Sequence, residues 1–327
     1  MGITVLSLFD GMSCGQIAFN KLGIKFDGKQ NRYFASEIKN HAIKVTKENY
    51  PNTIHVGDVT KISYKNGVLY TENGNYDIGR IDYLIGGSPC QDFSIAKTNN
   101  TKYGLEGDKS KLFYEYLRIL KEVNPRFFLL ENVRMKHDSK KQLDKYLNVE
   151  GKFINSIDFS FQNRPRFYWT NIKIHPYEPL NVNFQDFKDL DFEYCEKFKV
   201  KPTMSRIKMW NDGEGSNTRG TCANITNSDK VYCLTRKQDR SPNSGLIKHG
   251  DFCRFLTQRE LELAQTVPEG YTNCLTYNQA QCVLGDGWTV DIIKHILKSS
   301  FEKESVEAKI IKEQREEDNN IQFKWCI

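Results

Sequence analysis

The sequence contains no apolar run that approaches the roughly 20 residues of a membrane-spanning helix. Its first residues, Met1 to Leu8, lack the basic start of a secretory signal, and Asp10 interrupts the apolar run. The 9 cysteines include no CxxC pair and no histidine at zinc-type spacing, which argues against a structural metal. We therefore expect a cytoplasmic protein with reduced thiols, no metal and no membrane partner.

No internal repeat is visible, and 327 residues suffice for one large α/β domain plus a smaller one. The formal net charge is +6, and it is unevenly distributed. Between Lys197 and Arg254 the chain carries 12 Lys/Arg against 5 Asp/Glu, so the remainder is close to neutral. A segment of this kind suits a polyanionic partner, although a solvated basic face would look the same.

The first half of the chain alternates between strand and helix patterns. Residues 3–8 predict a strand, 9–15 a turn of small residues and 16–22 a helix. This arrangement can cradle a nucleotide-like ligand, although the spacing is not GxGxxG. Glu37 ends the next predicted strand, 33–36, and can accept both hydroxyls of a ribose or act as a helix-start carboxylate.

A third predicted strand, 54–59, contains Asp58 near its end, where a carboxylate can meet an adenine amino group. Three successive strand ends therefore carry Gly, Glu and Asp. Together they predict an adenosine-containing ligand with no phosphate to bind. Residues 61–75 resemble an inserted hairpin around Asn66-Gly67, to which the sequence assigns no function.

Cys90 follows the apolar strand predicted at 81–85 and the loop formers Gly86-Gly87-Ser88-Pro89. Ligands of open α/β sheets bind at the carboxyl ends of strands, so such a loop can present a thiol to a substrate. The thiolate is a strong nucleophile. The alternative is a small buried apolar side chain, which is a common role for a free cysteine.

Glu131 ends the following predicted strand, 126–130, and can share the pocket of the thiol or cap the next helix. Arg164 and Arg166 are separated by Pro165 and flanked by aromatic residues. Their guanidinium groups can bind a base or a phosphate, or the segment can be a strand with core aromatics.

The strand–helix alternation stops near residue 172. Residues 172–253 predict a smaller, loop-rich domain, and helical patterns return at 257–265, 279–284 and 290–297. Strands are also expected at 153–159, and helices at 40–50, 110–123 and 138–147. The tail, 302–318, predicts an exposed helix of mixed charge.

Four motifs in order resemble those of the DNA (cytosine-5)-methyltransferases, over most of the chain outside its middle. Pro89-Cys90-Gln91 resembles the nucleophile motif, Glu131-Asn132-Val133 the ENV motif, and Gln162-x-Arg164-x-Arg166 the QxRxR motif. The turn from Phe9 to Gly15, with Glu37 and Asp58, resembles the S-adenosylmethionine site. Arg254 to Gln265 resembles the motif after the recognition domain. Phe9-Asp10-Gly11 and the Ser88-Pro89-Cys90 loop look similar to the mammalian de novo enzymes, whereas the short length suits a bacterial or phage enzyme.

This resemblance implies a Rossmann-like S-adenosylmethionine-dependent domain at 1–171, a target-recognition domain at 172–253, and C-terminal helices at 254–327 that return to the first domain. It implies transfer of a methyl group to C5 of a flipped-out cytosine in double-stranded DNA, through a Cys90–C6 adduct. The implied catalytic residues are Cys90, Glu131, Asn132, Arg164 and Arg166. The implied cofactor-binding residues are Phe9, Asp10, Gly11, Met12, Ser13, Cys14, Glu37, Asp58, Val59, Pro89, Asp286 and Trp288.

The sequence departs from the family at two places. Gly285-Asp286-Gly287-Trp288 stands where Gly-Asn-x-Val is usual, so Asp286 or Trp288 would replace the asparagine that contacts the cofactor. Ser13-Cys14 replaces the usual second glycine of the first motif.

Two other functions are open: methylation of tRNA, and an inactive homologue that only binds DNA. The resemblance further implies a monomer, in some systems with a cognate restriction endonuclease.

Overall fold

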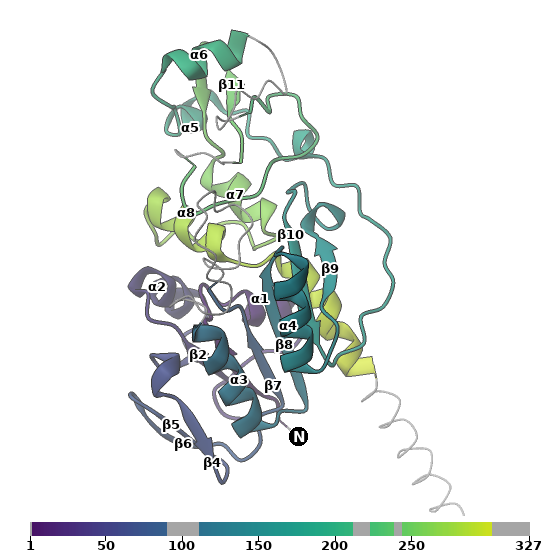
Figure 1. Ribbon diagram of the computed structural model, residues 1–327. Coiled ribbons are helices and arrows are strands. Elements are labelled where there is room, and N and C mark those ends of the chain that lie inside the picture. The colour runs from purple at the N-terminus through teal and green to yellow at the C-terminus, as the bar shows by residue number, and fades with distance from the viewer. Residues whose placement is uncertain (1, 90–110, 212–222, 239–243, 303–327) are drawn as a thin grey trace, which may run out of the picture.

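A twisted seven-stranded sheet lies at the centre of the computed structural model, which describes residues 2–89, 111–211, 223–238 and 244–302 (Figure 1). In spatial order the strands are β3 (Ile54–His55), β2 (Arg32–Ser36), β1 (Thr4–Leu8), β7 (Tyr83–Gly86), β8 (Phe127–Val133), β10 (Pro165–Thr170) and β9 (Lys152–Asn155). The first five are parallel, and β10 runs antiparallel to both β8 and β9. The order reverses between β1 and β7, and open α/β sheets bind ligands beside such a point.

The central strands are apolar on both faces. Along β7, Tyr83 and Ile85 belong to one buried cluster, whereas Leu84 belongs to the other. The same alternation separates Val5 from Leu6 in β1. A parallel sheet needs helices on both faces, and continuous apolar strands satisfy this requirement.

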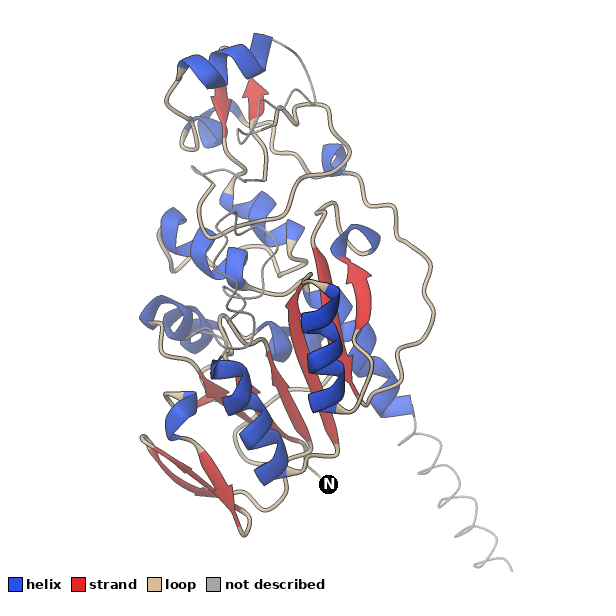
Figure 2. Cartoon of the chain, in the orientation of Figure 1, coloured by secondary structure: helices blue, strands red, loops and turns tan. Residues whose placement is uncertain are grey.

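Helices cover each face of the sheet (Figures 1 and 2). One cluster includes side chains of α1 (Cys14–Lys21), α2 (Asn40–Asn49), α7 (Gln258–Ala264), α8 (Tyr277–Asp286) and a last helix over 290–302. The opposite cluster includes α3 (Lys111–Val123) and α4 (His137–Leu147). The residues after 254 therefore pack on the same sheet as the first half of the chain. None of the described helices is long and apolar enough to cross a bilayer.

A small antiparallel sheet is inserted between β3 and β7. It consists of β4 (Ser63–Lys65), β5 (Val68–Thr71) and β6 (Gly74–Asp77), preceded by the short 3-10 turn η1 (Val59–Lys61). The predicted hairpin turn is confirmed, since Asn66 and Gly67 both have positive φ, as a tight hairpin of this type requires. β6 extends the hairpin to three strands.

The middle region, defined as residues 172–253, is mostly loop (Figure 2). Its described elements are η4 (Phe184–Asp186), α5 (Phe192–Glu196), α6 (Met204–Asn211), β11 (Ile247–His249) and β12 (Phe252–Arg254, which ends one residue beyond it). In Figure 1, α5, α6 and β11 lie at the top of the molecule, with α7 and α8 between them and the large sheet. The end of strand–helix alternation near residue 172 is thus confirmed.

Two predicted strands are too long. β3 covers two residues and β9 covers four, and each is followed by a 3-10 turn, η1 or η3 (Ser156–Asp158). The cause is local: the side chain of Asp58 accepts the N–H of Thr60, and that of Asn155 accepts the N–H of Ile157, which caps the two turns. The predicted tail helix beyond residue 302 lies outside the described residues.

Candidate functional site

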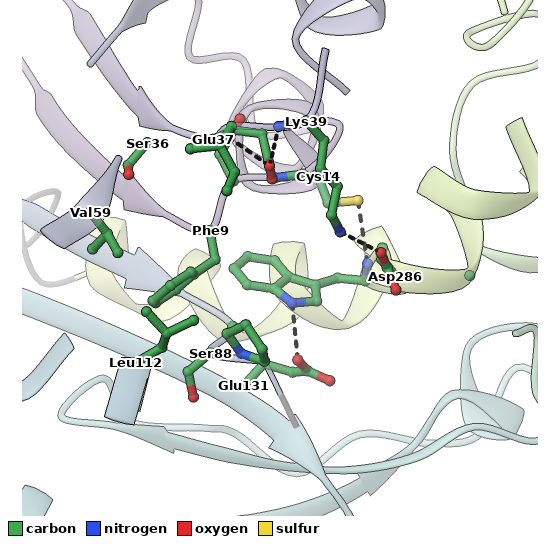
Figure 3. A pocket seen from close by; sticks show the side chains of 18 of the residues that line it. Phe9, Cys14, Ser36, Glu37, Lys39, Val59, Ser88, Leu112, Glu131 and Asp286 are labelled. Carbon is green, nitrogen blue, oxygen red and sulfur yellow. Dashed lines mark hydrogen bonds and ion pairs between the residues drawn. The ribbon is translucent and has the colours of Figure 1, made fainter. Parts of the chain in front are cut away.

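A cleft of about 270 Å³ lies at the carboxyl ends of β1, β2, β7 and β8 (Figure 3). β1, β2 and β7 contribute residues that follow them, whereas Glu131 and Val133 lie in the last part of β8 itself. The residues lining the cleft are Phe9, Asp10, Gly11, Cys14, Ser36, Glu37, Ile38, Lys39, Asp58, Val59, Gly87, Ser88, Pro89, Leu112, Glu131, Val133, Arg164, Arg166, Arg236, Gly285, Asp286, Gly287 and Trp288. Segments far apart in sequence therefore meet at the point that the sheet topology favours for ligand binding.

The turn after β1 has an unusual backbone. Phe9, Gly11 and Ser13 all have positive φ, which is uncommon for the two residues with side chains. Asp10 organises this turn, because its carboxylate accepts hydrogen bonds from the hydroxyl groups of Ser13 and Tyr33. Burial raises the pKa of Asp10 to about 6, and the hydrogen bonds oppose that rise.

Glu37 connects the ends of β1 and β2. One carboxylate oxygen accepts the N–H of Gly11 at 2.9 Å, and the other accepts the N–H groups of Ile38 and Lys39. Ile38 and Lys39 precede α2, whose first turn contains no acidic side chain, so the structure does not support the helix-start interpretation of this carboxylate. The side chain also lines the cleft, so the same oxygens remain beside any bound ligand.

Asp58 and Val59 also line the cleft, and in Figure 3 Val59, Phe9 and Leu112 lie together as an apolar group. The carboxylate of Asp58 accepts the N–H of Thr60 at 2.9 Å. Val59, Phe9 and Leu112 thus give the cleft a hydrophobic part, whereas Asp58 and Glu37 bring carboxylates to its lining.

Glu131 is 9% exposed and is held from two sides. One carboxylate oxygen lies 2.8 Å from Nε of Arg166, and the other accepts the indole N–H of Trp288 at 3.1 Å. The antiparallel register pairs Arg166 of β10 with Val133 of β8, and Glu131 lies two residues from Val133 on the same face of the strand. A buried ion pair of this kind has a fixed geometry, which suits a carboxyl group that must be oriented precisely toward a ligand.

The loop after β7 is attached to β8 through Asn132. Its side-chain amide lies 3.2 Å from the hydroxyl oxygen of Ser88, and its oxygen accepts the N–H of Val133. Pro89 reaches the lining of the cleft. Cys90 is the next residue, and it lies outside the described residues.

Arg164 is 3% exposed and connects three segments. Its guanidinium donates to the carbonyl oxygens of Leu234, Gly285 and Gly287 at 2.8 to 3.0 Å. It also lies 3.4 Å from the Cys233 sulfur. Burial acts to raise the pKa of the Cys233 thiol, but Arg164 and Arg166 outweigh it and leave that pKa below its usual value. Arg164 therefore joins the middle region to the end of α8 and the residue that follows it.

Asp286 is the last residue of α8, and Trp288 lies in the loop that follows. Asp286 pairs with Lys39 at 2.7 Å and with Arg236 at 3.4 Å, which closes one side of the cleft. The backbone N–H of Trp288 lies 3.4 Å from the sulfur of Cys14, whose pKa burial raises to about 12. Met12 and Ser13 are fully buried and are missing from the described lining of the cleft.

The sequence did not indicate Lys39, Leu112 or Arg236 as part of this site. Lys39 and Arg236 carry ordinary surface charges in the sequence, and only their shared partner Asp286 reveals them. Leu112 occupies an apolar position of a predicted helix and had no distinguishing feature.

The charged side chains of the cleft fit a nucleoside better than a phosphate. Glu37 and Asp58 are hydrogen-bond acceptors for hydroxyl and amino groups. All the described cations of the cleft, namely Lys39, Arg164, Arg166 and Arg236, already contact acceptors of the protein. No group of three or more His, Cys, Asp or Glu residues suited to a metal occurs in the described part of the chain.

A second, basic groove lies between the middle region and α8. Its lining includes Lys197, Lys199, Arg236 and Lys237, with Phe198, Phe255, Tyr277, Asn278, Gln281 and Cys282. Arg236 lines both the groove and the cleft. A polyanion bound along the groove would therefore reach the cleft directly.

Comparison with known proteins gives a consistent result. A family model described as C-5 cytosine-specific DNA methylase matches residues 3–208. The chain is similar to the type II methyltransferase M.NlaIV of Neisseria lactamica, with 34% identity over 61% of this chain and 45% of the relative. It therefore spans less than half of that relative. Similarity to M1.ScrFI of Lactococcus lactis subsp. cremoris is 29% over 91% of this chain and 78% of the relative.

Among solved structures, the Entamoeba histolytica methyltransferase EhMeth has a similar fold. The TM-score is 0.68 at 14% sequence identity, and the match covers 93% of this chain and 99% of that protein. This likeness supports the Rossmann-like fold that the motifs imply.

Proposed function

The chain belongs to the C-5 cytosine-specific DNA methylase family, and from that membership we propose that it transfers a methyl group from S-adenosylmethionine to C5 of cytosine in double-stranded DNA. The observation that carries the proposal is the position of Glu131. It is fixed between Arg166 and Trp288 in the same cleft as the carboxylates suited to an adenosine. One cleft thus contains both the elements for a nucleoside cofactor and those for a polarised base.

The cleft is suited to the cofactor, which supplies an electrophilic methyl group on sulfur. Glu37 would bind the ribose hydroxyls, and Asp58 the adenine amino group. Phe9, Val59 and Leu112 would contact the adenine ring. The left-handed turn at Gly11 leaves the backbone open beside these groups, because no other atom lies within 4 Å of the position a side chain would take. Asp286 and Trp288 would close the opposite wall.

Glu131 and Cys90 would activate the cytosine. Attack of the Cys90 thiolate on C6 would form an S–C6 bond and shift electron density to C5. C5 would then bond to the methyl carbon as the bond from that carbon to the sulfonium sulfur breaks, which releases S-adenosyl-L-homocysteine. Glu131 would hold the proton at N3 and contact the exocyclic amine, and Arg166 would stabilise negative charge at O2. Removal of the C5 proton restores the ring double bond and expels the thiolate. Arg164 and Asn132 would keep the surrounding loops in position.

The cytosine must leave the duplex, since C6 is inaccessible inside stacked DNA. The basic groove beside the cleft suits the phosphates that flank a flipped base. We further propose the domain division at residues 171 and 253, a cytoplasmic monomer, and a restriction-modification context like that of the type II relatives.

The thiol step is tested with duplex DNA that contains 5-fluorocytosine, on which an active thiol leaves a stable adduct. We expect the wild type to form a covalent complex in the presence of S-adenosylmethionine and Cys90→Ser to form none. Cys274→Ser removes a thiol from a loop outside the cleft and serves as the matched control. Trapping by Cys90→Ser would exclude this thiol. Parallel assays with tRNA test the alternative substrate.

A further inference from the structure

The inserted sheet β4–β6 touches the cofactor cleft indirectly, through its last turn. Glu72 and Asn73 lie in the turn between β5 and β6. Glu72 accepts the backbone N–H of Asp58 at 2.7 Å, and the Asn73 amide donates to the carbonyl oxygen of His55 at 3.0 Å. Two consecutive residues of the insertion therefore hold the segment that leads into Asp58.

The same segment is held from the other side by the large sheet. The hydroxyl of Ser36, at the end of β2, donates to the carbonyl oxygen of Gly57 at 2.8 Å. Gly57 has a positive φ, and a side chain there would begin 2.2 Å from a carboxylate oxygen of Glu72. The left-handed backbone favours glycine, and a side chain there would displace the Glu72 carboxylate from its present position.

The insertion is itself firmly attached to α3. The guanidinium of Arg118 donates to the carbonyl oxygen of Ile62, and Glu122 accepts the N–H of Tyr64. Arg118 also pairs with Glu115 and Glu122 along its own helix. Lys61 lies 2.7 Å from the second oxygen of Glu72, in an ion pair that is exposed to solvent.

We propose that Glu72 is a positioning residue for cofactor recognition, and that the inserted sheet is a brace for the adenine-binding loop. The inference rests on the proposed function, in which Asp58 meets the adenine amino group. The hydrogen bond from the Asp58 N–H to Glu72 holds the Asp58 backbone in place. It therefore sets the position of the Asp58 carboxylate relative to the apolar group of the cleft. Glu72 itself does not line the cleft, so it acts through Asp58.

The test is calorimetric titration of S-adenosyl-L-homocysteine and its inosine counterpart into the full chain. The inosine base has an oxo group in place of the 6-amino group, so it lacks the exocyclic N–H that adenine would donate to Asp58. Glu72→Ala should weaken binding of the adenosine compound about five- to tenfold, with less than a twofold change for the inosine compound. The turnover number at saturating cofactor should stay within about twofold of the wild type.

Matched variants separate positioning from general stability. Glu72→Gln keeps an oxygen acceptor for the Asp58 N–H, and Lys61→Met removes only the ion pair, so both should bind like the wild type. Asn73→Ala should weaken adenosine binding about twofold; it keeps the inference testable if Glu72→Ala does not fold. Unchanged binding by the alanine variants, or equal losses for both compounds, would overturn the brace. If the wild type binds neither compound, the proposed function itself fails.

Discussion

The large sheet and the outer part of the middle region, which contains α5, α6 and β11, are built in different ways. The sheet has two extensive buried clusters, one on each face. Among the described residues, the outer middle region has a small buried cluster of Val200, Leu246 and Cys253, with Trp210 and Phe255 packed against it. Large apolar side chains there, such as Leu190 and Met204, are 73% and 82% exposed. Apolar burial thus shapes the first region, and local polar contacts hold much of the second.

This difference suits a division of labour between the two regions. A rigid sheet edge keeps Glu37, Glu131 and Arg166 in fixed positions, as chemistry requires. Loops with few buried contacts tolerate sequence change and can be adapted to a binding partner. The following predictions test this contrast, beginning with the largest effect.

Arg254 at the end of β12 and Glu260 of α7 form a buried ion pair, and both side chains are 0% exposed. We call this contact between the two regions the seam. Glu260→Ala should lower the free energy of unfolding by about 3–5 kcal/mol, because it leaves the Arg254 charge buried and unpaired. Glu150→Ala breaks an exposed pair with Lys152 and should cost less than about 1 kcal/mol. Urea denaturation measures both. Equal small losses would mean that the seam contributes no more than a surface contact.

Stability of the sheet edge should depend on pH through Asp10. Because burial raises its folded-state pKa to about 6, the folded state retains this proton in a pH range where the unfolded chain has lost it. The contribution is therefore fully present below the unfolded pKa, near 4, and is lost as pH rises to about 6. Relative to Asp10→Asn, the wild type should lose about 2–3 kcal/mol between pH 4 and 7. A pH-independent difference between the two unfolding curves contradicts this prediction.

One substitution made in each region compares their roles directly. Trp288→Phe removes the N–H that Glu131 accepts and should lower the turnover number about tenfold. Trp210→Phe removes an indole N–H that has no partner among the described residues, so the rate should change less than about twofold. Methyl-transfer kinetics at saturating DNA measure both. Similar effects from the two variants would remove the distinction between the regions.

The middle region should respond to salt more than to pH. Lys199 and Lys237 line the basic groove, and neutralising a phosphate contact makes the salt dependence of DNA binding shallower by about one unit per lysine. Lys199→Gln and Lys237→Gln should therefore weaken binding modestly and reduce this slope. Lys25→Gln, an exposed lysine outside the groove, should leave it unchanged. A slope that is the same in all three variants would place the DNA elsewhere.

Most of the sheet could be predicted from the sequence, because buried parallel strands are continuous apolar runs and their helices repeat every three to four residues. The ends of β3 and β9 could not, since Asp58 and Asn155 cap turns that shorten both strands. The motif residues Glu131, Arg164 and Arg166 do meet at one cleft. Their hydrogen-bond partners follow from long-range packing, as in the contacts of Arg164 with Gly285 and Gly287.

The sequence alone determined the alternation of strands and helices, the turn residues at the strand ends, and the motifs that define the family. Only the tertiary structure decided which residues, remote in the sequence, form hydrogen bonds and ion pairs with the residues of the cleft. Trp288 reaches Glu131 across 157 positions, and Lys39 reaches Asp286 across 247. The physical reason is that periodicity and turn formation depend on neighbours along the chain. An ion pair or hydrogen bond between remote segments exists only after the hydrophobic faces of the sheet have been covered.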